Sequence, residues 1–529
     1  MPSIGSVTLG DISGRPEALT TRAQGRGFSR FVIPDLALVA SLVTLFYCLF
    51  LFAGYGKLFR DSDAGWHIRT GESILSTREL PTTDPYSFTR QGRPWFAWEW
   101  GSDALTGVAY RAAGLSGVAW LYGMVIAAGV WFWFRLTWLV GGDFLIACLL
   151  AAPLLSTTNI HWLARPHVLS WLLFLAALAG AELASGRPVR PRHTLAVAAL
   201  TALWANLHAS FFFAPLICLI YGAGHALRPV IWDLDRREEW RKARWFGLAA
   251  TVSAAASLVN PYGWQLHRHL FDYLTDAELM ARIGEFQSFN FHAEGAFQIV
   301  LTLGIAMLGA ALALGQKQLG RFLLAAALIY AALRSARGLP LVALALLPMA
   351  NAGIAKGLAA ASGLRPTVRR AIQSFLAYSA GLRAHDSRFS GLALAPVFAI
   401  LMFGMLRAPG IAAHTGFPPD QFPVAAAAEV DRLPASARIL APDKFGGYLI
   451  YRFEGRRKVF FDGRSDLYGS DFLKQYARLT QLRPGWRAQL DEFGFTHALL
   501  PNDYSLLPAL EALGWKQLYR DGTATLLAR

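Results

Sequence analysis

Long apolar segments recur along this chain and decide its class. Of its 529 residues, 54% are hydrophobic and only 16% are charged, which is more apolar surface than a water-soluble core could bury. About eleven segments are apolar over enough residues to cross a bilayer as helices. They cover 32–53, 115–139, 144–160, 167–184, 194–207, 210–227, 245–259, 296–315, 320–334, 338–355 and 391–408. The sequence therefore predicts a polytopic α-helical membrane protein with about eleven spans.

The positions of Lys and Arg predict which side of the membrane each loop occupies. Basic residues gather before the first span and in alternate loops, for example at Arg30, Arg190 and Arg237. Because basic loops stay in the cytoplasm, 1–31 is expected to be a cytoplasmic tail, 32–408 the membrane domain and 409–529 extracytoplasmic. The same rule accounts for the formal net charge of +15, so no nucleic-acid partner is expected. Segment 194–227 fits either two short crossings or a re-entrant pair of half-helices.

Unusual polar residues collect, in this topology, at the outer ends of the spans and in outer loops over about 54–114 and 260–295. Asp61, Asp63 and His67 directly follow the first span. Ionisable groups at a membrane edge are costly, so this cluster indicates a functional site. The alternative interpretation of the cluster is a solvated loop that caps a helix. Glu99 lies between Trp98 and Trp100, where an apolar setting would raise its pKa so that it acts as an acid; it could equally pair with Arg93.

Arginine and histidine residues on the same face indicate a phosphate site. Guanidinium groups suit bidentate phosphate binding, although an arginine at a helix end can also simply extend toward the interface. Two clusters of arginine lie on the outer side of the membrane, where the positive-inside rule gives no reason to expect basic residues. The candidates for binding substrate or a lipid phosphate are Arg165, His167, His208, Arg334, Arg337, Glu99 and Glu285.

The chain changes character after Ala413. Short strands and helices alternate, which predicts a compact α/β domain. Strands are expected over 438–441, 458–461, 496–500, 515–519 and 523–527, with helices near 445–453, 470–482 and 504–513. Asp462-Gly463-Arg464 follows an expected strand, so it is either a ligand contact or a turn with an internal Asp and Arg pair.

The acidic motif Asp61-Ser62-Asp63, placed directly after the first span, resembles that of the GT-C fold of glycosyltransferases, which take sugars from polyprenyl-linked donors. Several further stretches resemble a largely uncharacterised bacterial branch with this organisation. They are Asp63-Ala-Gly-Trp66-His67-Ile-Arg69-Thr-Gly71, Leu80-Pro81-Thr-Thr-Asp84-Pro85-Tyr86-Ser87, Asn260-Pro261-Tyr262-Gly263, Gly446-Gly447-Tyr448 and Asp462-Gly463-Arg464. The chain lacks both the Asp-Glu pair of protein mannosyltransferases and the Trp-Trp-Asp motif of oligosaccharyltransferases, so donor sugar and acceptor cannot be carried over.

The resemblance implies an inverting glycosyltransferase at the outer face of a bacterial plasma membrane. Its donor would be a polyprenyl-phosphate sugar in contact with membrane lipids, and its acceptor a glycan, a lipid or a protein. Asp63 would be the first choice for catalytic base and Asp61 the second, with His67 assisting either. Asp61 and Asp63 could alternatively hold a divalent metal, Mg or Mn. The competing hypothesis is a non-catalytic component that binds lipid-linked glycan for assembly or transport of a surface polysaccharide.

Overall fold

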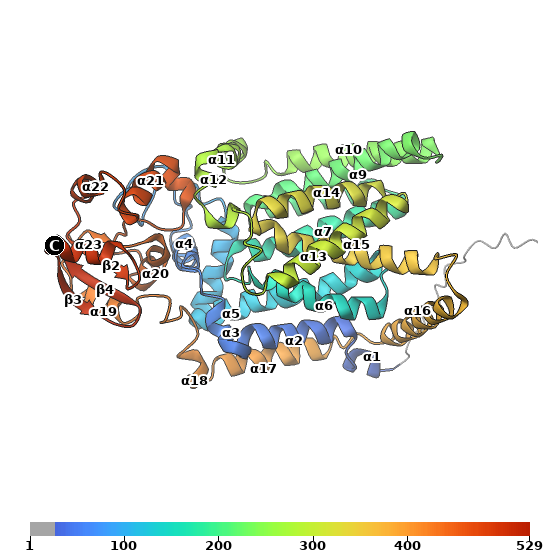
Figure 1. Cartoon of the computed structure of the whole chain (residues 1–529), viewed down its shortest axis with the longest axis horizontal. Helices are drawn as coiled ribbons and strands as arrows, with labels where there is room; N and C mark the ends of the chain where they lie inside the picture. Colours follow the sequence, from blue (N-terminus) through green and yellow to red (C-terminus); the bar gives the residue numbers. More distant parts are fainter. Residues whose placement is uncertain (1–26) are drawn as a thin grey trace, which may run out of the picture.

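Most of the chain is helical, and a small sheet lies at one end of the helical bundle (Figure 1). The computed structural model describes residues 27–529, so most of the predicted tail over 1–31 lies outside the described residues. The helical part comprises α1 (Ser29–Val32), α2 (Leu36–Phe50), η1 (Leu51–Ala53), α3 (Gly54–Lys57), α4 (Asp63–Thr77), α5 (Trp100–Leu139), α6 (Phe144–Asn159), α7 (Pro166–Gly186), α8 (Pro191–Ala205), η2 (Ala209–Phe212), α9 (Phe213–Ile231), α10 (Arg236–Ala256), α11 (Trp264–Thr275), α12 (Ala277–Met280), η3 (Gly284–Phe286), α13 (Ala296–Gly315), α14 (Leu319–Arg334), η4 (Ala336–Gly338), α15 (Leu339–Ala359), α16 (Pro366–Asp386), α17 (Leu394–Leu406) and α18 (Pro409–Ala412). The C-terminal part comprises α19 (Ala426–Asp431), β1 (Ile439–Leu440), α20 (Asp443–Arg452), α21 (Ser465–Thr480), α22 (Trp486–Glu492), β2 (His497–Pro501), α23 (Leu506–Ala512), β3 (Lys516–Arg520) and β4 (Ala524–Ala528).

Among the described residues, six helical stretches are long and apolar enough to cross a membrane, which makes this a multi-pass membrane protein. They are Ser29–Lys57, Trp100–Leu139, Pro166–Gly186, Ala209–Ile231, Ala296–Gly315 and Ala336–Ala359, with shorter apolar helices at α6 and α17. The predicted count of about eleven is therefore not reached. The helices α8 and α14 have only 15 and 16 residues, and α10 begins with a run of charged residues. The uncertain segment 194–227 is divided into α8 and α9 by a break at 206–208.

Helix starts follow capping residues that precede apolar segments. The side chain of Asp35 accepts the backbone N–H of Leu38 at the start of α2, and Asp143 does the same for Ile146 at the start of α6. Proline occupies the first turn of α7, where its missing N–H costs nothing. The helix α5 bends where Gly114 has a φ of +60°, so its first half lies beside α4 and its second half enters the bundle.

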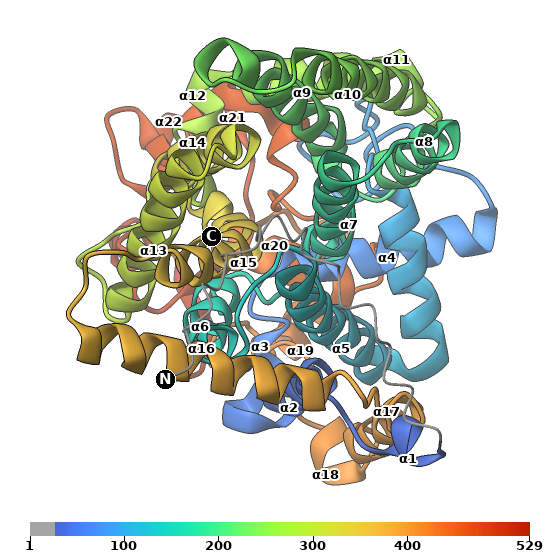
Figure 2. The ribbon, with the colours of Figure 1, turned by 90° about the vertical axis from the view of Figure 1, so that its right-hand side faces the viewer.

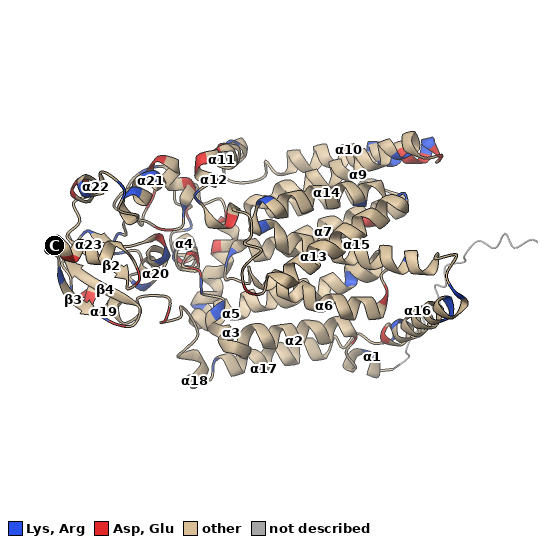
Figure 3. Ribbon diagram, viewed as in Figure 1, with Lys and Arg blue, Asp and Glu red and all other residues tan. Residues whose placement is uncertain are grey.

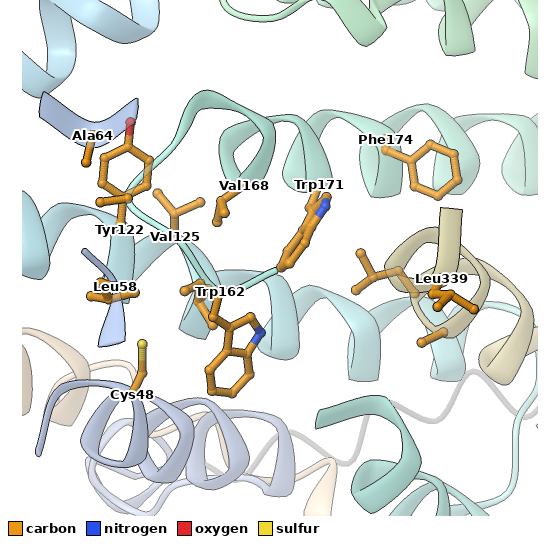
Figure 4. Close-up of a cluster of buried hydrophobic side chains, with 14 of the residues drawn as sticks. Cys48, Leu58, Ala64, Tyr122, Val125, Trp162, Val168, Trp171, Phe174 and Leu339 are labelled. Carbon is orange, nitrogen blue, oxygen red and sulfur yellow. The ribbon is translucent and has the colours of Figure 1, made fainter. Parts of the chain in front are cut away.

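Close packing holds the bundle together. Figure 4 shows Tyr122 and Val125 of α5, Val168 and Trp171 of α7, and Trp162 meeting in one buried cluster. Apolar burial between helices gains little in a lipid environment, so fitted side chains and interhelical hydrogen bonds carry the stability. Charged residues gather near the two ends of the bundle and are sparse along its middle (Figure 3), and α16 runs across the end far from the sheet (Figure 2).

A four-stranded mixed sheet forms the C-terminal part, with strand order β1-β2-β4-β3. The strand β1 is parallel to β2, whereas β4 is antiparallel to both β2 and β3. Four of the five predicted strands are confirmed. The fifth, 458–461, is not a strand of this sheet, because Val459 instead forms a single parallel bridge with Ser87 of the first outer loop. This segment therefore ties the C-terminal part to the loop that carries the acidic motif.

Candidate active site

A cavity of about 810 Å³ lies where the end of the helical bundle meets the C-terminal part. Its lining comes from the start of α4, the segments before α5 and α7, η2, the region of η3 and η4, and the turn before α21. Residues far apart in sequence thus share one space, as sorting by membrane face predicts. The predicted residues in its wall are Asp61, Asp63, Glu99, Arg165, His167, His208, Glu285 and Arg337.

Arg165 is the centre of the charged network in this cavity. Its Nη1 lies 2.6 Å from Oδ2 of Asp61 and 2.9 Å from Oε1 of Glu285, and its Nη2 lies 2.9 Å from Oδ2 of Asp63. The following proline holds Arg165 in an extended conformation, and the N–H of Ala164 donates to the carbonyl of Leu58. The loop between α6 and α7 is thereby fixed against the end of the first span, which aims the guanidinium at the acidic motif.

Glu285 links this network to a second arginine. The Nε of Arg337 donates to Oε2 of Glu285 at 2.5 Å, and the guanidinium of Arg337 lies over the ring of Phe286 at 4.6 Å. The hydroxyl of Ser335 donates to the backbone carbonyl of Glu285, which joins η3 to η4. Burial raises the pKa of Glu285, but Arg165 and Arg337 together lower it by more. The pKa of Glu285 therefore lies well below its usual value. Glu285 is therefore ionised and keeps the two guanidinium groups together.

The two aspartates of the acidic motif have different environments. Oδ1 of Asp61 accepts the backbone N–H of Asp63 at 2.9 Å, at the start of α4, while its Oδ2 contacts Arg165. Asp63 is buried, and burial raises its pKa to about 7; Arg165 acts against that shift, while Asp61 and Glu285 add to it. A carboxylate with a pKa near neutrality is suited to accept and release a proton at physiological pH.

A turn of the C-terminal part packs directly on Asp63. A Cβ added at Gly463 would lie 1.9 Å from Oδ1 of Asp63, so only glycine allows this approach. Next to it, Arg464 is buried, with its Nη2 2.8 Å from Oδ1 of Asp84 and its Nε 2.8 Å from Oδ1 of Asp462. The interpretation of 462–464 as a turn with an internal Asp and Arg pair is thus confirmed. The contact of Gly463 with Asp63 leaves no pattern in the local sequence from which it could be predicted.

A second polar group occupies another part of the wall. The Oε1 of Glu99 lies 3.3 Å from Nε2 of His208, and its Oε2 lies 3.8 Å from Nε2 of His67. The other ring nitrogen of His67, Nδ1, lies 2.6 Å from Oδ1 of Asp103. Burial raises the pKa of Glu99 to about 8, and burial lowers the pKa of His67 well below its usual value. Asp103 was not predicted, although its spacing of four residues from Glu99 at a helix start places both on one face.

Comparison with solved structures assigns the fold. No family model and no curated protein matches the chain. The chain is similar in structure to an oligosaccharyltransferase of Archaeoglobus fulgidus, AglB, in complex with an inhibitory peptide and a dolichol-phosphate. The TM-score is 0.55 at 11% sequence identity, and the match covers 88% of this chain and 69% of that one. The chain has the GT-C fold. Two further structures of the oligosaccharyltransferase from this organism, an apo form and one tethered to an acceptor peptide, give TM-scores of 0.52 and 0.51 at 11% identity. They cover 88% of this chain, and 69% and 68% of theirs.

In this GT-C fold, two predicted residues lie outside the cavity wall. Arg334 is exposed on the last turn of α14 and is not among the lining residues, so the prediction that it joins Arg337 in one cluster is corrected. The helix α14 ends at Arg334 and Ser335 is extended, so Arg337 belongs to a separate element, η4. His67 is buried behind Glu99 rather than exposed to the cavity.

The cavity of this GT-C chain also has an extended apolar side. Trp171 and Phe174 of α7, Phe213 of α9, Leu328 of α14 and Leu341 of α15 all contribute to it. These residues belong to helices of the bundle, whereas the ionisable residues lie at helix ends and in loops. The cavity therefore joins a charged region to an apolar region that continues toward the interior of the bundle.

The acidic motif does not form a metal site in the described residues. Among residues 27–529, no group of three or more His, Cys, Asp or Glu side chains is arranged to hold a metal ion. Asp61 and Asp63, the residues named for Mg or Mn, both contact Arg165 instead. In this arrangement the donor set does not fit a divalent ion.

Proposed function

We propose that this chain is an inverting glycosyltransferase that moves a sugar from a polyprenyl-phosphate donor to an acceptor hydroxyl. One observation carries the proposal: a single cavity combines an aspartate whose pKa is about 7, two guanidinium groups and an apolar wall formed by membrane helices. A polyprenyl-phosphate sugar needs these three things, namely a base for the acceptor, cations for the phosphate and an apolar path for the lipid. The GT-C fold, shared with an oligosaccharyltransferase whose structure holds dolichol-phosphate, supports it.

Asp63 acts as the base in this proposal. Its carboxylate takes the proton of the acceptor hydroxyl while the acceptor oxygen forms a bond to the anomeric carbon of the sugar. The bond between that carbon and the phosphate oxygen breaks on the opposite face, and its electron pair stays on the phosphate. Single displacement inverts the anomeric centre and needs one base. Contact with Gly463 and Arg165 holds Asp63 in one position, which is how a base contributes through orientation.

Arg165, Arg337 and His167 bind the lipid phosphate. In the structure Arg165 is shared among Asp61, Asp63 and Glu285, so an arriving phosphate competes with these carboxylates for its N–H groups. When the donor phosphodiester leaves as a monoester, it gains negative charge, which the guanidinium groups of Arg165 and Arg337 stabilise more strongly than they stabilise the ground state. The apolar wall that includes Phe174 and Leu328 receives the first isoprene units.

The site lies on the extracytoplasmic face of a plasma membrane in this proposal. Basic residues such as Arg236, Arg237 and Arg241 lie at the start of α10, at the end of the bundle far from the cavity (Figure 3). By the positive-inside rule that end faces the cytoplasm, which leaves the cavity and the region 409–529 outside. The acceptor, whether glycan, lipid or protein, would then enter from the aqueous side between the first outer loop and the C-terminal part.

Donor turnover tests this function. Purified protein is supplied with polyprenyl-phosphate sugars and an extract of envelope acceptors, and release of polyprenyl phosphate is compared among the parent, Asp63→Asn and Asp61→Asn. We expect Asp63→Asn to lower turnover by about 10³-fold, within the range for loss of a positioned base. Binding of the donor with no turnover by the parent would favour the other candidate, a non-catalytic component that binds lipid-linked glycan for assembly or transport.

A further inference from the structure

Glu99, His67 and Asp103 form a buried group that the transfer step above does not use. The exposed fraction of the side chain is 12% for Glu99 and 1% for both His67 and Asp103. His67 lies between the two carboxylates, with Nδ1 toward Asp103 and Nε2 toward Glu99. Only Glu99 reaches the cavity wall. The three side chains therefore form a line that runs from the protein interior to the space where the substrate would bind.

Charge balance requires this line to hold an extra proton. Among the described residues, no Lys or Arg lies within 4.0 Å of a carboxylate oxygen of Glu99 or Asp103. With a neutral imidazole between them, two ionised carboxylates would leave two negative charges in a buried place, which is strongly unfavourable. One added proton reduces this to a single charge, shared across the Asp103 and His67 pair at 2.6 Å.

A second histidine, His208, lies on the other side of the Glu99 carboxyl. The backbone N–H of Ser210 donates to Nδ1 of His208 at 3.1 Å, so Nδ1 carries a lone pair and the ring proton sits on Nε2. The Nε2 of His208 lies 3.3 Å from Oε1 of Glu99. The hydrogen bond between Nδ1 of His67 and Oδ1 of Asp103 fixes the orientation of the imidazole ring, which turns Nε2 toward Oε2 of Glu99 at 3.8 Å. Both neighbours of the Glu99 carboxyl are thus imidazoles rather than Lys or Arg side chains, so this mostly buried group has no strong cation beside it to keep it ionised.

We propose that Glu99 is the proton donor to the departing lipid phosphate, with His67 and Asp103 as positioning residues that keep it protonated. This rests on the proposed function. The O–H bond of the protonated Glu99 carboxyl breaks as the phosphate oxygen receives both the electron pair of the glycosidic bond and the proton. Asp63 has meanwhile taken one proton from the acceptor, so protons balance, and exchange with water restores both carboxyls. The pKa of about 8 for Glu99, above that of about 7 for Asp63, agrees with an acid and a base that coexist near neutrality.

Several other ionisable groups face Glu99 and would contribute to its titration. They are His67 and Asp63 from α4, Asp103 from α5, Arg165 before α7, His208 before η2, Arg337 from η4 and Asp466 from α21. Burial is the largest cause of the raised pKa; the two arginines lower it, and Asp63 and Asp466 raise it. A variant of Asp103 reaches Glu99 only through His67, whereas a variant of Arg337 acts on it directly through charge.

The pH profile of kcat tests the proposal, with the parent, Glu99→Gln, Glu99→Asp and Asp103→Asn in the same membrane preparation. The parent is expected to lose activity above about pH 8 as Glu99 ionises. Glu99→Gln should lower kcat by about 10²-fold, which is the low end for general acid catalysis because phosphate is already a good leaving group. The same variant should also abolish the basic limb of the profile, which is the loss of kcat above about pH 8. Glu99→Asp should retain a basic limb, and Asp103→Asn should move it. Glu72→Gln, a half-buried carboxylate outside the cavity wall, is the control and should leave the profile unchanged.

The outcomes separate this inference from the function beneath it. Full turnover by Glu99→Gln, or a basic limb that survives in that variant, would overturn the proton-donor role and leave the glycosyltransferase proposal intact. Loss of the basic limb in Glu99→Gln, with the acidic limb from Asp63 preserved, would support it. A parent that turns over no polyprenyl-phosphate sugar would overturn both.

Discussion

A methyl group added at Gly463 is a sharp probe of the site, since it perturbs the proposed base without changing any ionisable residue. The Cβ of Gly463→Ala would lie 1.9 Å from Oδ1 and 2.7 Å from Cγ of Asp63, whereas real Cβ contacts are not shorter than 3.0 Å. The carboxylate must therefore retreat by about 1 Å or the turn must lift away, and a misplacement of that size can cost about 10²-fold in rate. We expect kcat to fall by about that factor, while the affinity for polyprenyl phosphate stays close to that of the parent.

The assay compares donor turnover, polyprenyl-phosphate binding and thermal unfolding of Gly463→Ala with those of Gly522→Ala. Gly522 belongs to the same C-terminal part, and a Cβ added there meets no atom within 4 Å. Overpacking at Gly463 should also lower the free energy of unfolding by roughly 1–3 kcal/mol. Parent-level turnover by Gly463→Ala, with a melting temperature equal to that of Gly522→Ala, would refute the close contact between this turn and Asp63.

Three further predictions follow from the network around the cavity. Arg337→Ala should raise KM for the lipid donor by at least about tenfold, since a hydrogen bond to a charged group contributes roughly 1.5–3 kcal/mol. Arg334→Ala, at an exposed position, should leave KM unchanged. Equal effects of the two substitutions would contradict the proposal that Arg337 binds the lipid phosphate. Turnover should rise as the pH passes 7, because the base works only when ionised and the pKa of Asp63 is about 7. Asp61→Asn should shift this rise, the acidic limb of the profile, to lower pH, since Asp61 raises the pKa of Asp63. An unmoved limb would argue against Asp63 as the titrating group. Arg464→Met should lower the free energy of unfolding by about 3–5 kcal/mol, because it leaves two buried aspartates without their shared cation; a melting temperature equal to that of the parent would contradict this.

The sequence predicts which residues share a face of the membrane, and this was enough to bring most of the site together. Asp61, Asp63, Arg165 and Glu285 come from three separate stretches of the chain, yet they meet in direct ion pairs. Sorting by face works because each crossing returns the chain to one of only two surfaces. Arg334 shows its limit, since it reaches the correct face but lies outside the cavity wall.

Other features could not be predicted because they depend on tertiary contacts. The approach of Gly463 to Asp63 joins positions 400 residues apart and leaves no local pattern. The expected strand over 458–461 has the right composition, but its backbone pairs with the outer loop at Ser87 instead of with the sheet. The number of spans was overestimated because apolar composition alone does not reveal that α8 and α14 are short. Asp103 was missed because it belongs to an apolar-looking helix start.

The most direct test of the central claim is a cryo-EM structure of the chain in a lipid nanodisc with a polyprenyl-phosphate sugar and the Asp63→Asn substitution to prevent turnover. We expect the phosphate to lie within hydrogen-bond distance of Arg165 or Arg337. The lipid should follow the wall formed by Phe174 and Leu328, and the anomeric carbon should face residue 63. A phosphate bound elsewhere, with the cavity between the bundle and the C-terminal part filled by water alone, would contradict it.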